Sequence, residues 1–470
     1  MKDLLHKTLF VSTTLLLLLI LIQTGTGVFK LKPLNGVSNE AEIPKLTLKS
    51  YTDHSFQDGL NRYLLKHLGF REWMIRLYNQ YLWSCFHETN NATVMRGKGN
   101  WLFGEGRVKE HYESLMYKYT NDTAEMKRIL ETEALRLWKV QELLKEYNIY
   151  IFVDINPSKH VIFPEYLPEN RSYFRPIGVR AYDYLKKRFD DLNVNYIDFI
   201  PVFKNLKDTA DYPLFTETGA HWSNIASWHA FDSIIKYMEH IGNQNLVNLD
   251  IYDKHYDKTR SPDNDLELVL NLIFPIKTPK NLYAVVGVKR DSLAAKPNFL
   301  TVGDSFFWNI LGNVPLWEIF QSNTYWFYNS TIHGDKAHTS TSELDFEQEL
   351  MRHDYIMLIY NTVTLYEFSH KFLPRALLHL CYDKAAIDSM ALNIIDSISL
   401  YHPEQYREVL HVAKETKQNV DTVLHKKALD MLYTEPEKYF KELEGNKLPT
   451  HRNKDLKAIR NNCTFALSNK

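Results

Sequence analysis

The sequence has few cysteines and almost no net charge. Only 3 of its 470 residues are cysteines, Cys85, Cys381 and Cys463, and they lie far apart in the chain. So few cysteines exclude a disulfide scaffold or a cysteine-based metal cluster, and at most one bridge can form within the chain. The formal net charge is −1, which gives no support for nucleic-acid binding. We therefore expect no metal, no cofactor and no nucleic-acid partner.

Charged residues are also absent from a long stretch near the N-terminus. No charged side chain occurs from Thr8 to Phe29, and residues 15–22 are continuously apolar. This length meets the need of a helix that spans a bilayer, about 20 apolar residues. We expect residues 1–29 to be a membrane anchor or a signal segment.

The flanks of this stretch bear on its orientation and processing. Lys2 and Lys7 precede it, which favours a cytoplasmic N-terminus, although Lys30 and Lys32 follow it. The small residues 25–27 also suit a cleaved signal peptide, but the Ala-x-Ala pattern is missing. Under either interpretation the remaining chain lies outside the cytoplasm. We expect a single-pass inner-membrane protein with its main domain in the periplasm or outside the cell.

The rest of the chain divides into three parts. Residues 30–94 begin with a polar linker and continue with helical spacing of apolar residues. Residues 95–374 show an alternation of helical and strand patterns. Residues 375–470 show helical patterns only, ending in a polar tail.

The middle part predicts an α/β domain. Its short apolar runs read as buried strands separated by amphipathic helices, and such alternation predicts a mostly parallel central sheet. The candidate strands are 149–155, 194–200, 299–302, 324–328 and 355–360.

One serine follows a candidate strand at a position suited to chemistry. In parallel sheets functional groups collect at the carboxyl ends of strands, and strand 299–302 leads directly into Gly303-Asp304-Ser305. The glycine permits a sharp turn, and backbone N–H groups at the start of the next helix can stabilise an oxyanion. Ser305 is therefore a candidate nucleophile, while an ordinary helix cap is the alternative for Asp304 and Ser305.

A histidine occupies a second turn of the same kind. His221 stands before a predicted helix that Ser223 can cap, with Trp222 beside it and Gly219 leaving room. A serine hydroxyl needs a base to remove its proton, and histidine is the usual one because its pKa lies near neutrality. Ser305 and His221 together suggest a hydrolase-like dyad.

Several blocks of the sequence resemble the alginate O-acetyltransferases, periplasmic enzymes that acetylate exopolysaccharides through an SGNH-hydrolase-like domain. The resemblance runs from about residue 55 to 375, with His before Ser, a circular permutation relative to ordinary SGNH esterases. It implies a three-layer α/β/α domain with a mostly parallel central sheet. The blocks that carry it are 70–79, 97–103, 156–159 with 164–168, the His221-Trp222 pair and Gly303-Asp304-Ser305.

One family residue is missing. The family places its catalytic acid two residues before the histidine, in Asp-x-His-Trp, and Gly219 occupies that position here. The resemblance therefore implies Ser305 as nucleophile and His221 as base, but leaves the acid open. Glu217, Asp211, Asp304 or a backbone carbonyl are the alternatives, of which we select Glu217 because it is nearest to His221. We expect Glu217→Gln to lower turnover.

Four further residues are candidates for oxyanion stabilisation or substrate binding. Asn361 directly follows the strand 355–360, Lys159 lies in a block that resembles the family, and Asp304 adjoins the nucleophile. Trp222 is a candidate for stacking on a sugar ring. Each has a structural alternative, as a strand terminator, a turn cap or a packed core residue.

These expectations combine into a membrane-anchored O-acetyltransferase that acts on a polysaccharide. The resemblance implies a partner, a membrane-bound O-acyltransferase that supplies acetyl groups across the bilayer. Two alternatives stay open. A polysaccharide acetyl-esterase uses the same groups, and a non-catalytic binding or assembly subunit would have lost activity together with the family aspartate.

Overall fold

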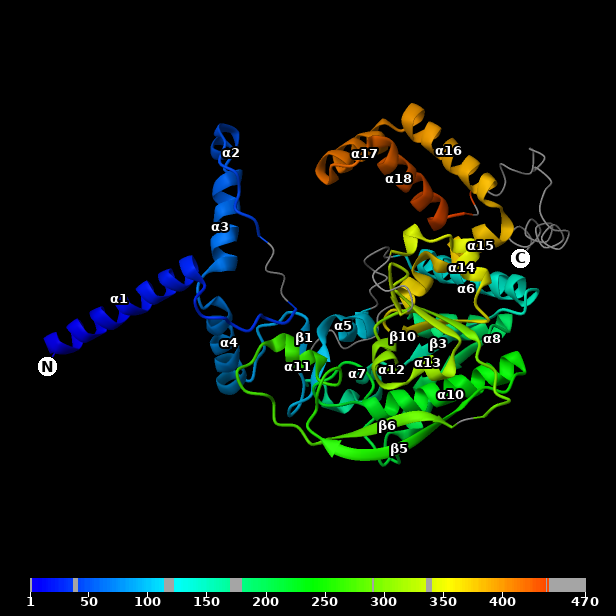
Figure 1. Ribbon diagram of the computed structural model, residues 1–470, viewed down its shortest axis with the longest axis horizontal. Helices are drawn as coiled ribbons and strands as arrows, with labels where there is room; N and C mark the ends of the chain where they lie inside the picture. Colours follow the sequence, from blue (N-terminus) through cyan, green and yellow to red (C-terminus); the bar gives the residue numbers. More distant parts are fainter. Residues whose placement is uncertain are drawn as a thin grey trace.

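The computed structural model describes residues 2–36, 41–113, 122–169, 180–289, 291–334, 340–436 and 438 (Figure 1). Its first helix, α1 (Lys2–Thr26), projects from the body of the protein. Within Asp3–Thr26 this helix contains an 18-residue window with a mean hydropathy of 2.0, and none of that window is buried. It is the one helix in the described part that is long and apolar enough to cross a membrane, and a signal sequence has the same properties. The lead-in helices follow as α2 (Leu48–Thr52), α3 (Ser55–His67), α4 (Arg71–Tyr81) and a π-helical turn at Leu82–Phe86.

A six-stranded sheet forms the centre of the main domain. Its strand order is β4-β3-β10-β7-β8-β9, and all neighbouring pairs are parallel except β8 with β9. The mostly parallel sheet predicted from the sequence is therefore confirmed. The strands are β3 (Tyr150–Asn156), β4 (Tyr196–Asp198), β7 (Asn298–Gly303), β8 (Ser322–Phe327), β9 (Thr331–Gly334) and β10 (Tyr355–Asn361).

Helices cover both faces of this sheet because its central strands are apolar on both sides. In β3, Ile151 and Val153 belong to one hydrophobic cluster, whereas Phe152 belongs to the other. Burial of each such side chain contributes roughly 1.5–3 kcal/mol. The first face is covered by α6 (Thr123–Lys145), α8 (Ala181–Leu192) and α15 (Phe372–Cys381), the second by α10 (Asn224–Gly242), α12 (Phe307–Asn313) and α13 (Leu316–Ile319). This is the three-layer arrangement that the resemblance implied.

Two small antiparallel sheets were not predicted from the sequence. The antiparallel pair β5 (Asn248–Asp257) and β6 (Asn281–Lys289) packs against α10. Its first strand is largely exposed and rich in charged residues, so it lacks the apolar run of a buried strand. The other pair, β1 (Val94–Arg96) and β2 (Leu102–Gly104), has only three residues in each strand.

The last described helices form a layer beside the α/β domain (Figure 1). They are α16 (Lys384–Tyr401), α17 (Pro403–Thr416) and α18 (Val420–Thr434), and α18 also contacts α15. The predicted polar tail lies outside the described residues. The remaining short elements are α5 (Glu105–Glu113), α7 (Lys159–Ile162), α9 (Phe199–Leu206), α11 (Asp265–Leu270), α14 (Phe346–Met351) and 3-10 turns at Pro164–Tyr166, Thr341–Glu343 and Leu365–Lys371.

Candidate active site

Ser305 lies in the turn between β7 and α12, at the carboxyl edge of the central sheet. Close packing explains the glycine that precedes this turn. A Cβ atom on Gly303 would lie 1.9 Å from the backbone oxygen of Ile359, so a larger residue would push β7 away from β10. The Ser305 side chain is half-buried, as a nucleophile that meets a substrate must be.

Asp304 and Asn361 hold this turn in place. The Asp304 carboxylate accepts hydrogen bonds from the backbone N–H of Phe306 at 3.0 Å, from the backbone N–H and Nδ2 of Asn361 at 2.7 and 2.6 Å, and from the Thr364 hydroxyl at 2.7 Å. Asp304 and Asn361 are both fully buried. Asn361 and Asp304 were candidates for oxyanion stabilisation or substrate binding. Their side-chain hydrogen bonds instead connect the ends of β7 and β10.

His221 meets Ser305 from the other side of the turn. It stands just before α10, whose first turn Ser223 caps by accepting from the Ala226 backbone N–H. The His221 Nε2 atom lies 2.7 Å from Ser305 Oγ. The two predicted loop-to-helix turns therefore bring the expected base and nucleophile into hydrogen-bond contact.

A third residue completes the arrangement, and it is Asp265. Its Oδ2 atom lies 2.8 Å from His221 Nδ1, while Oδ1 accepts from the backbone N–H groups of Ala220 at 2.8 Å and Leu266 at 2.9 Å. A carboxylate at Nδ1 keeps the proton of a neutral imidazole on that nitrogen and leaves Nε2 free to accept the serine proton. Ser305, His221 and Asp265 thus have the geometry of a catalytic triad.

The surroundings favour the ionised form of Asp265. Burial by itself raises the pKa of this carboxyl. The charge of His221 and the hydrogen bonds from its ring and from Ala220 outweigh burial, so the pKa lies below its usual value. Asp265 is also the first residue of α11, where a negative charge is favoured by the helix dipole.

The expectation for Glu217 requires correction, because the carboxylate that contacts His221 belongs to Asp265. The space at Gly219 gives the physical reason why the acid comes from elsewhere. A Cβ atom on Gly219 would lie 2.4 Å from the backbone oxygen of Asp263, two residues before the acid. The loop that delivers Asp265 therefore occupies the space that an aspartate at position 219 would need.

Lys159 is buried and bonds to backbone rather than to open solvent. Its ammonium group donates to the carbonyl oxygens of Leu102 and Glu217 at 2.8 Å and of Gly219 at 2.9 Å. Burial lowers its pKa, while Asp265 and Glu217 oppose this effect. The residue was expected to contact substrate, but these bonds instead tie β2 and α7 to the loop that carries His221.

Trp222 is likewise a packing residue. Its side chain is fully buried, and its indole Nε1 donates to the backbone oxygen of Phe306 at 3.1 Å. It also packs edge-on against the Phe306 ring, at 5.3 Å between ring centroids. Because the Trp222 ring has no exposed face, it cannot stack on a sugar. Its contacts with Phe306 instead hold the turn of His221 against the turn of Ser305.

Two residues that the sequence analysis did not select lie at the nucleophile. The Arg107 guanidinium, from α5, donates from Nη2 to Ser305 Oγ at 3.3 Å. Its Nη1 atom is buried without a hydrogen-bond partner, and Arg107 forms no ion pair within the described ranges. The Tyr328 hydroxyl, just after β8, interacts with the Ser305 side chain. Burial and the nearby Asp304 carboxylate raise the pKa of Tyr328, so its hydroxyl keeps its proton at neutral pH.

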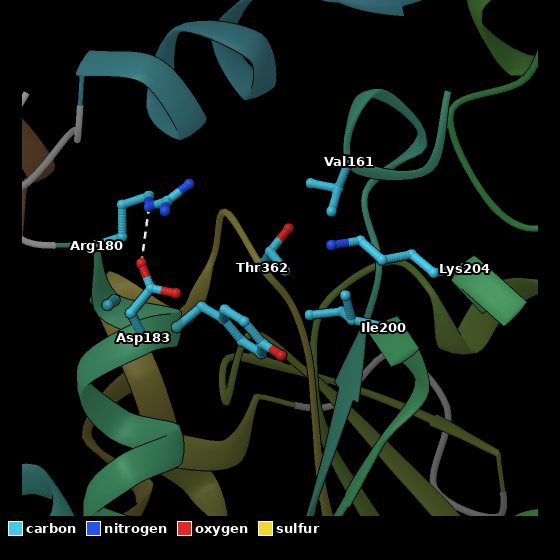
Figure 2. A pocket seen from close by; sticks show the side chains of 8 residues that line it. Val161, Arg180, Asp183, Ile200, Lys204 and Thr362 are labelled. Atoms are coloured by element: carbon cyan, nitrogen blue, oxygen red, sulfur yellow. Dashed lines mark hydrogen bonds and ion pairs between the residues drawn. The ribbon is translucent and has the colours of Figure 1, made fainter. Parts of the chain in front are cut away.

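A small pocket lies at the same edge of the sheet (Figure 2). Arg180 and Lys204 reach into it from opposite sides, with Thr362 between them, and Arg180 donates to Asp183 at 2.8 Å. Its volume of about 120 Å³ is well below the roughly 300–1,000 Å³ of small-molecule sites. We assign no role to it.

Comparison with known proteins gives a match over part of the chain. Residues 94–281 match the family model for the SGNH hydrolase-like domain of the acetyltransferase AlgX. The matched residues include His221 and Asp265, whereas Ser305 lies beyond them. No curated protein matches the sequence.

Solved structures resemble the chain only distantly. The O-acetyltransferase domain of Pseudomonas putida AlgJ is 15% identical, with a TM-score of 0.39, over 58% of this chain and 92% of that one. Pseudomonas aeruginosa AlgX is 13% identical, with a TM-score of 0.37, over 60% and 66%. Bacillus cereus PatB1 is 12% identical, with a TM-score of 0.38, over 59% and 99%. These likenesses are too distant to carry an argument about the site.

The family match and the sheet topology agree with each other. The match begins at β1 and ends at the start of β6, so it spans the histidine turn and the loop that brings Asp265 to it. The resemblance seen in the sequence is therefore confirmed. Over residues 94–281, this chain is similar to the SGNH hydrolase-like domain of the acetyltransferase AlgX.

Proposed function

We propose that this protein is an extracytoplasmic O-acetyltransferase that moves acetyl groups onto hydroxyls of a polysaccharide through an acetyl-serine intermediate. The observation that carries the proposal is the hydrogen-bonded chain from Ser305 through His221 to Asp265. The family match supports acetyl transfer as the reaction class. Helix α1 is consistent with the expected anchor in the inner membrane, and a membrane-bound O-acyltransferase is the proposed supplier of acetyl groups.

In the first half-reaction His221 Nε2 takes the proton of Ser305 as Oγ attacks the acetyl carbonyl carbon of the donor. The bond from Oγ to that carbon forms, and the bond to the leaving oxygen breaks while His221 returns the proton to it. Asp265 stabilises the imidazolium that forms between these steps. The second half-reaction runs in reverse, with a sugar hydroxyl as attacking group and Ser305 as leaving group.

Three donors are available for the oxyanion in this proposal. Arg107 and the Tyr328 hydroxyl both contact the Ser305 side chain. The third donor in the proposal is the backbone N–H of Ser305 itself. Donors that are held in place before the reaction stabilise developing charge without reorganisation, and loss of one costs about 10²–10³ in rate. Arg107 takes the role that the sequence analysis gave to Asn361.

The geometry also bears on the two alternatives. A non-catalytic subunit was considered because the family aspartate is missing, but Asp265 supplies a carboxylate at the same nitrogen of His221. This contact supports the enzymatic proposal over that alternative. An esterase transfers the acetyl group to water and needs no binding site for an acceptor hydroxyl. The transferase and the esterase alternatives therefore differ in the acceptor.

The experiment that tests the function follows the acetyl group from a small ester donor to its destination. Protein, 4-nitrophenyl acetate and a mixture of polysaccharides are incubated, and glycan-bound acetyl is measured by NMR against free acetate. We expect acetylated glycan with the wild type and none with Ser305→Ala. Release of free acetate alone, at any acceptor concentration, identifies an esterase, and identical rates for both proteins contradict the proposal altogether.

A further inference from the structure

A second, larger cavity is lined by Tyr328, the residue whose hydroxyl interacts with Ser305. Its volume is about 660 Å³, within the range of small-molecule sites. It is bounded by α6, the turn from Leu365 to Lys371 and the end of α18. Through Tyr328 the cavity borders the reaction centre.

The charges of this lining balance one another. The lining contains four glutamates, two arginines, one lysine and one histidine. Several are paired within the lining, with Arg128 bound to Glu125 at 2.6 Å and His370 lying 3.6 Å from Glu367. Arg136 is bound to Glu133 and donates to the backbone oxygen of Thr434 at 3.1 Å. Paired charges of this kind create no field that attracts a polyanion.

Aromatic and polar groups complete the surface. Tyr328 and Tyr366 are half-buried and border the cavity, and the Tyr328 ring packs on the His370 ring at 4.8 Å. Amphipathic rings beside hydrogen-bonding carboxylates and the hydroxyls of Thr132 and Thr434 suit a ligand with apolar C–H faces and many hydroxyls.

The backbone beneath the cavity is strained. Ser369, His370 and Lys371 have φ angles of 69°, 44° and 64°, which non-glycine residues rarely adopt in succession. Each such residue costs on the order of 1–3 kcal/mol and persists only where its surroundings fix it. Here Ser369 donates to Glu133 at 2.8 Å, and Asn329 donates to the backbone oxygen of His370 at 3.0 Å. The second bond links the strained turn to the residue next to Tyr328.

We propose that this cavity holds the acceptor, a neutral glycan, and presents one of its hydroxyls past Tyr328 to Ser305. The inference rests on the proposed function and adds the class of acceptor, since a polyuronate would find no excess positive charge here. It also gives the C-terminal helices a role, because the end of α18 closes one side of the cavity.

The test fills the cavity without touching the catalytic groups. Thr132 lines it from the surface of α6, and Thr132→Trp places a large ring there. Glu142→Trp puts the same ring on an exposed position of the same helix outside the lining and serves as control. Glu125→Trp, at the exposed first turn of α6, is a second blocking variant that does not depend on packing at Thr132.

Binding is measured calorimetrically on the full chain carrying Ser305→Ala, with cello-, malto- and chitohexaose and with a hexameric oligouronate. We expect at least one neutral hexasaccharide to bind, with affinity lowered at least tenfold by Thr132→Trp and unchanged by Glu142→Trp. Absence of neutral binding, tighter binding of the oligouronate, or insensitivity to both blocking variants overturns the proposal.

A second readout separates this proposal from the function on which it rests. Hydrolysis of 4-nitrophenyl acetate needs the Ser305 centre but not the glycan, so Thr132→Trp should leave its rate within twofold of wild type. If wild type and Ser305→Ala hydrolyse the ester equally, the proposed function fails. If only glycan binding fails the test, the acceptor site is wrong and the acyl-transfer centre stands.

Discussion

Asp265→Asn is expected to lower kcat/KM for acetyl-ester turnover by about 10³–10⁴, with the fold intact. Asparagine keeps the size of the side chain, but an amide at His221 Nδ1 no longer favours the required tautomer and no longer balances the imidazolium charge. The loss should appear mainly in kcat, because the imidazolium forms only as the reaction proceeds. Steady-state kinetics with 4-nitrophenyl acetate, together with circular dichroism, provide the measurement.

Glu217→Gln is the matched control for this substitution. It makes the same chemical change on the same loop as His221, at the residue that sequence proximity favoured as the acid. Because the His221 ring contacts Asp265, we expect Glu217→Gln to keep turnover within about threefold of wild type, against the 10³–10⁴ expected for Asp265→Asn. A larger loss of turnover in Glu217→Gln than in Asp265→Asn would identify Glu217 as the catalytic acid.

Gly219→Asp, which restores the family's residue, is expected to damage the enzyme. Its Cβ atom would overlap the backbone oxygen of Asp263, so the loop before α11 must move and carry Asp265 away from His221. We expect a loss of roughly 1–3 kcal/mol in the free energy of unfolding, as for other overpacked sites. Turnover should fall by about 10² or more, since a displacement of about 1 Å is enough for such a loss. Urea denaturation and ester hydrolysis measure the two effects.

Two controls isolate the cause. Gly219→Ala adds the same Cβ without a charge and should lose nearly as much stability. Gly312→Ala adds a Cβ on α12 where no atom lies within 4 Å, and it should leave stability equal or slightly higher. A Gly219→Asp protein with wild-type stability and turnover would show that aspartates at positions 219 and 265 fit together. This result would contradict the explanation that the loop before Asp265 occupies the space needed at position 219.

The central fold was predictable because its strands are buried on both faces. Runs such as Ile151-Phe-Val153 carry apolar residues without interruption, which marks a central parallel strand. The β5–β6 pair was missed because its first strand is largely exposed, is rich in charged residues and lacks an apolar run. Strand β4 proved shorter than its predicted range 194–200, because Phe199 and Ile200 begin a helix that Asp198 caps.

The candidate site was predictable only where local sequence determines it. Ser305 and His221 each lie two residues after a glycine and precede a helix, so their turns were visible in the sequence. Asp265 had no such signal, because its proximity to His221 depends on the path of a loop that only the folded chain defines. Arg107 was hidden in the same way, since α5 is distant from Ser305 in sequence.

Direct detection of an acetyl group on Ser305 tests the central claim. The full chain is mixed with 4-nitrophenyl acetate, quenched in acid within the first turnovers and digested for peptide mass spectrometry. The account predicts one acetyl group, on the peptide that contains Ser305, and a much slower appearance of it in Asp265→Asn. Turnover without acetyl-Ser305, or acetyl-Ser305 that forms equally fast in Asp265→Asn, would contradict it.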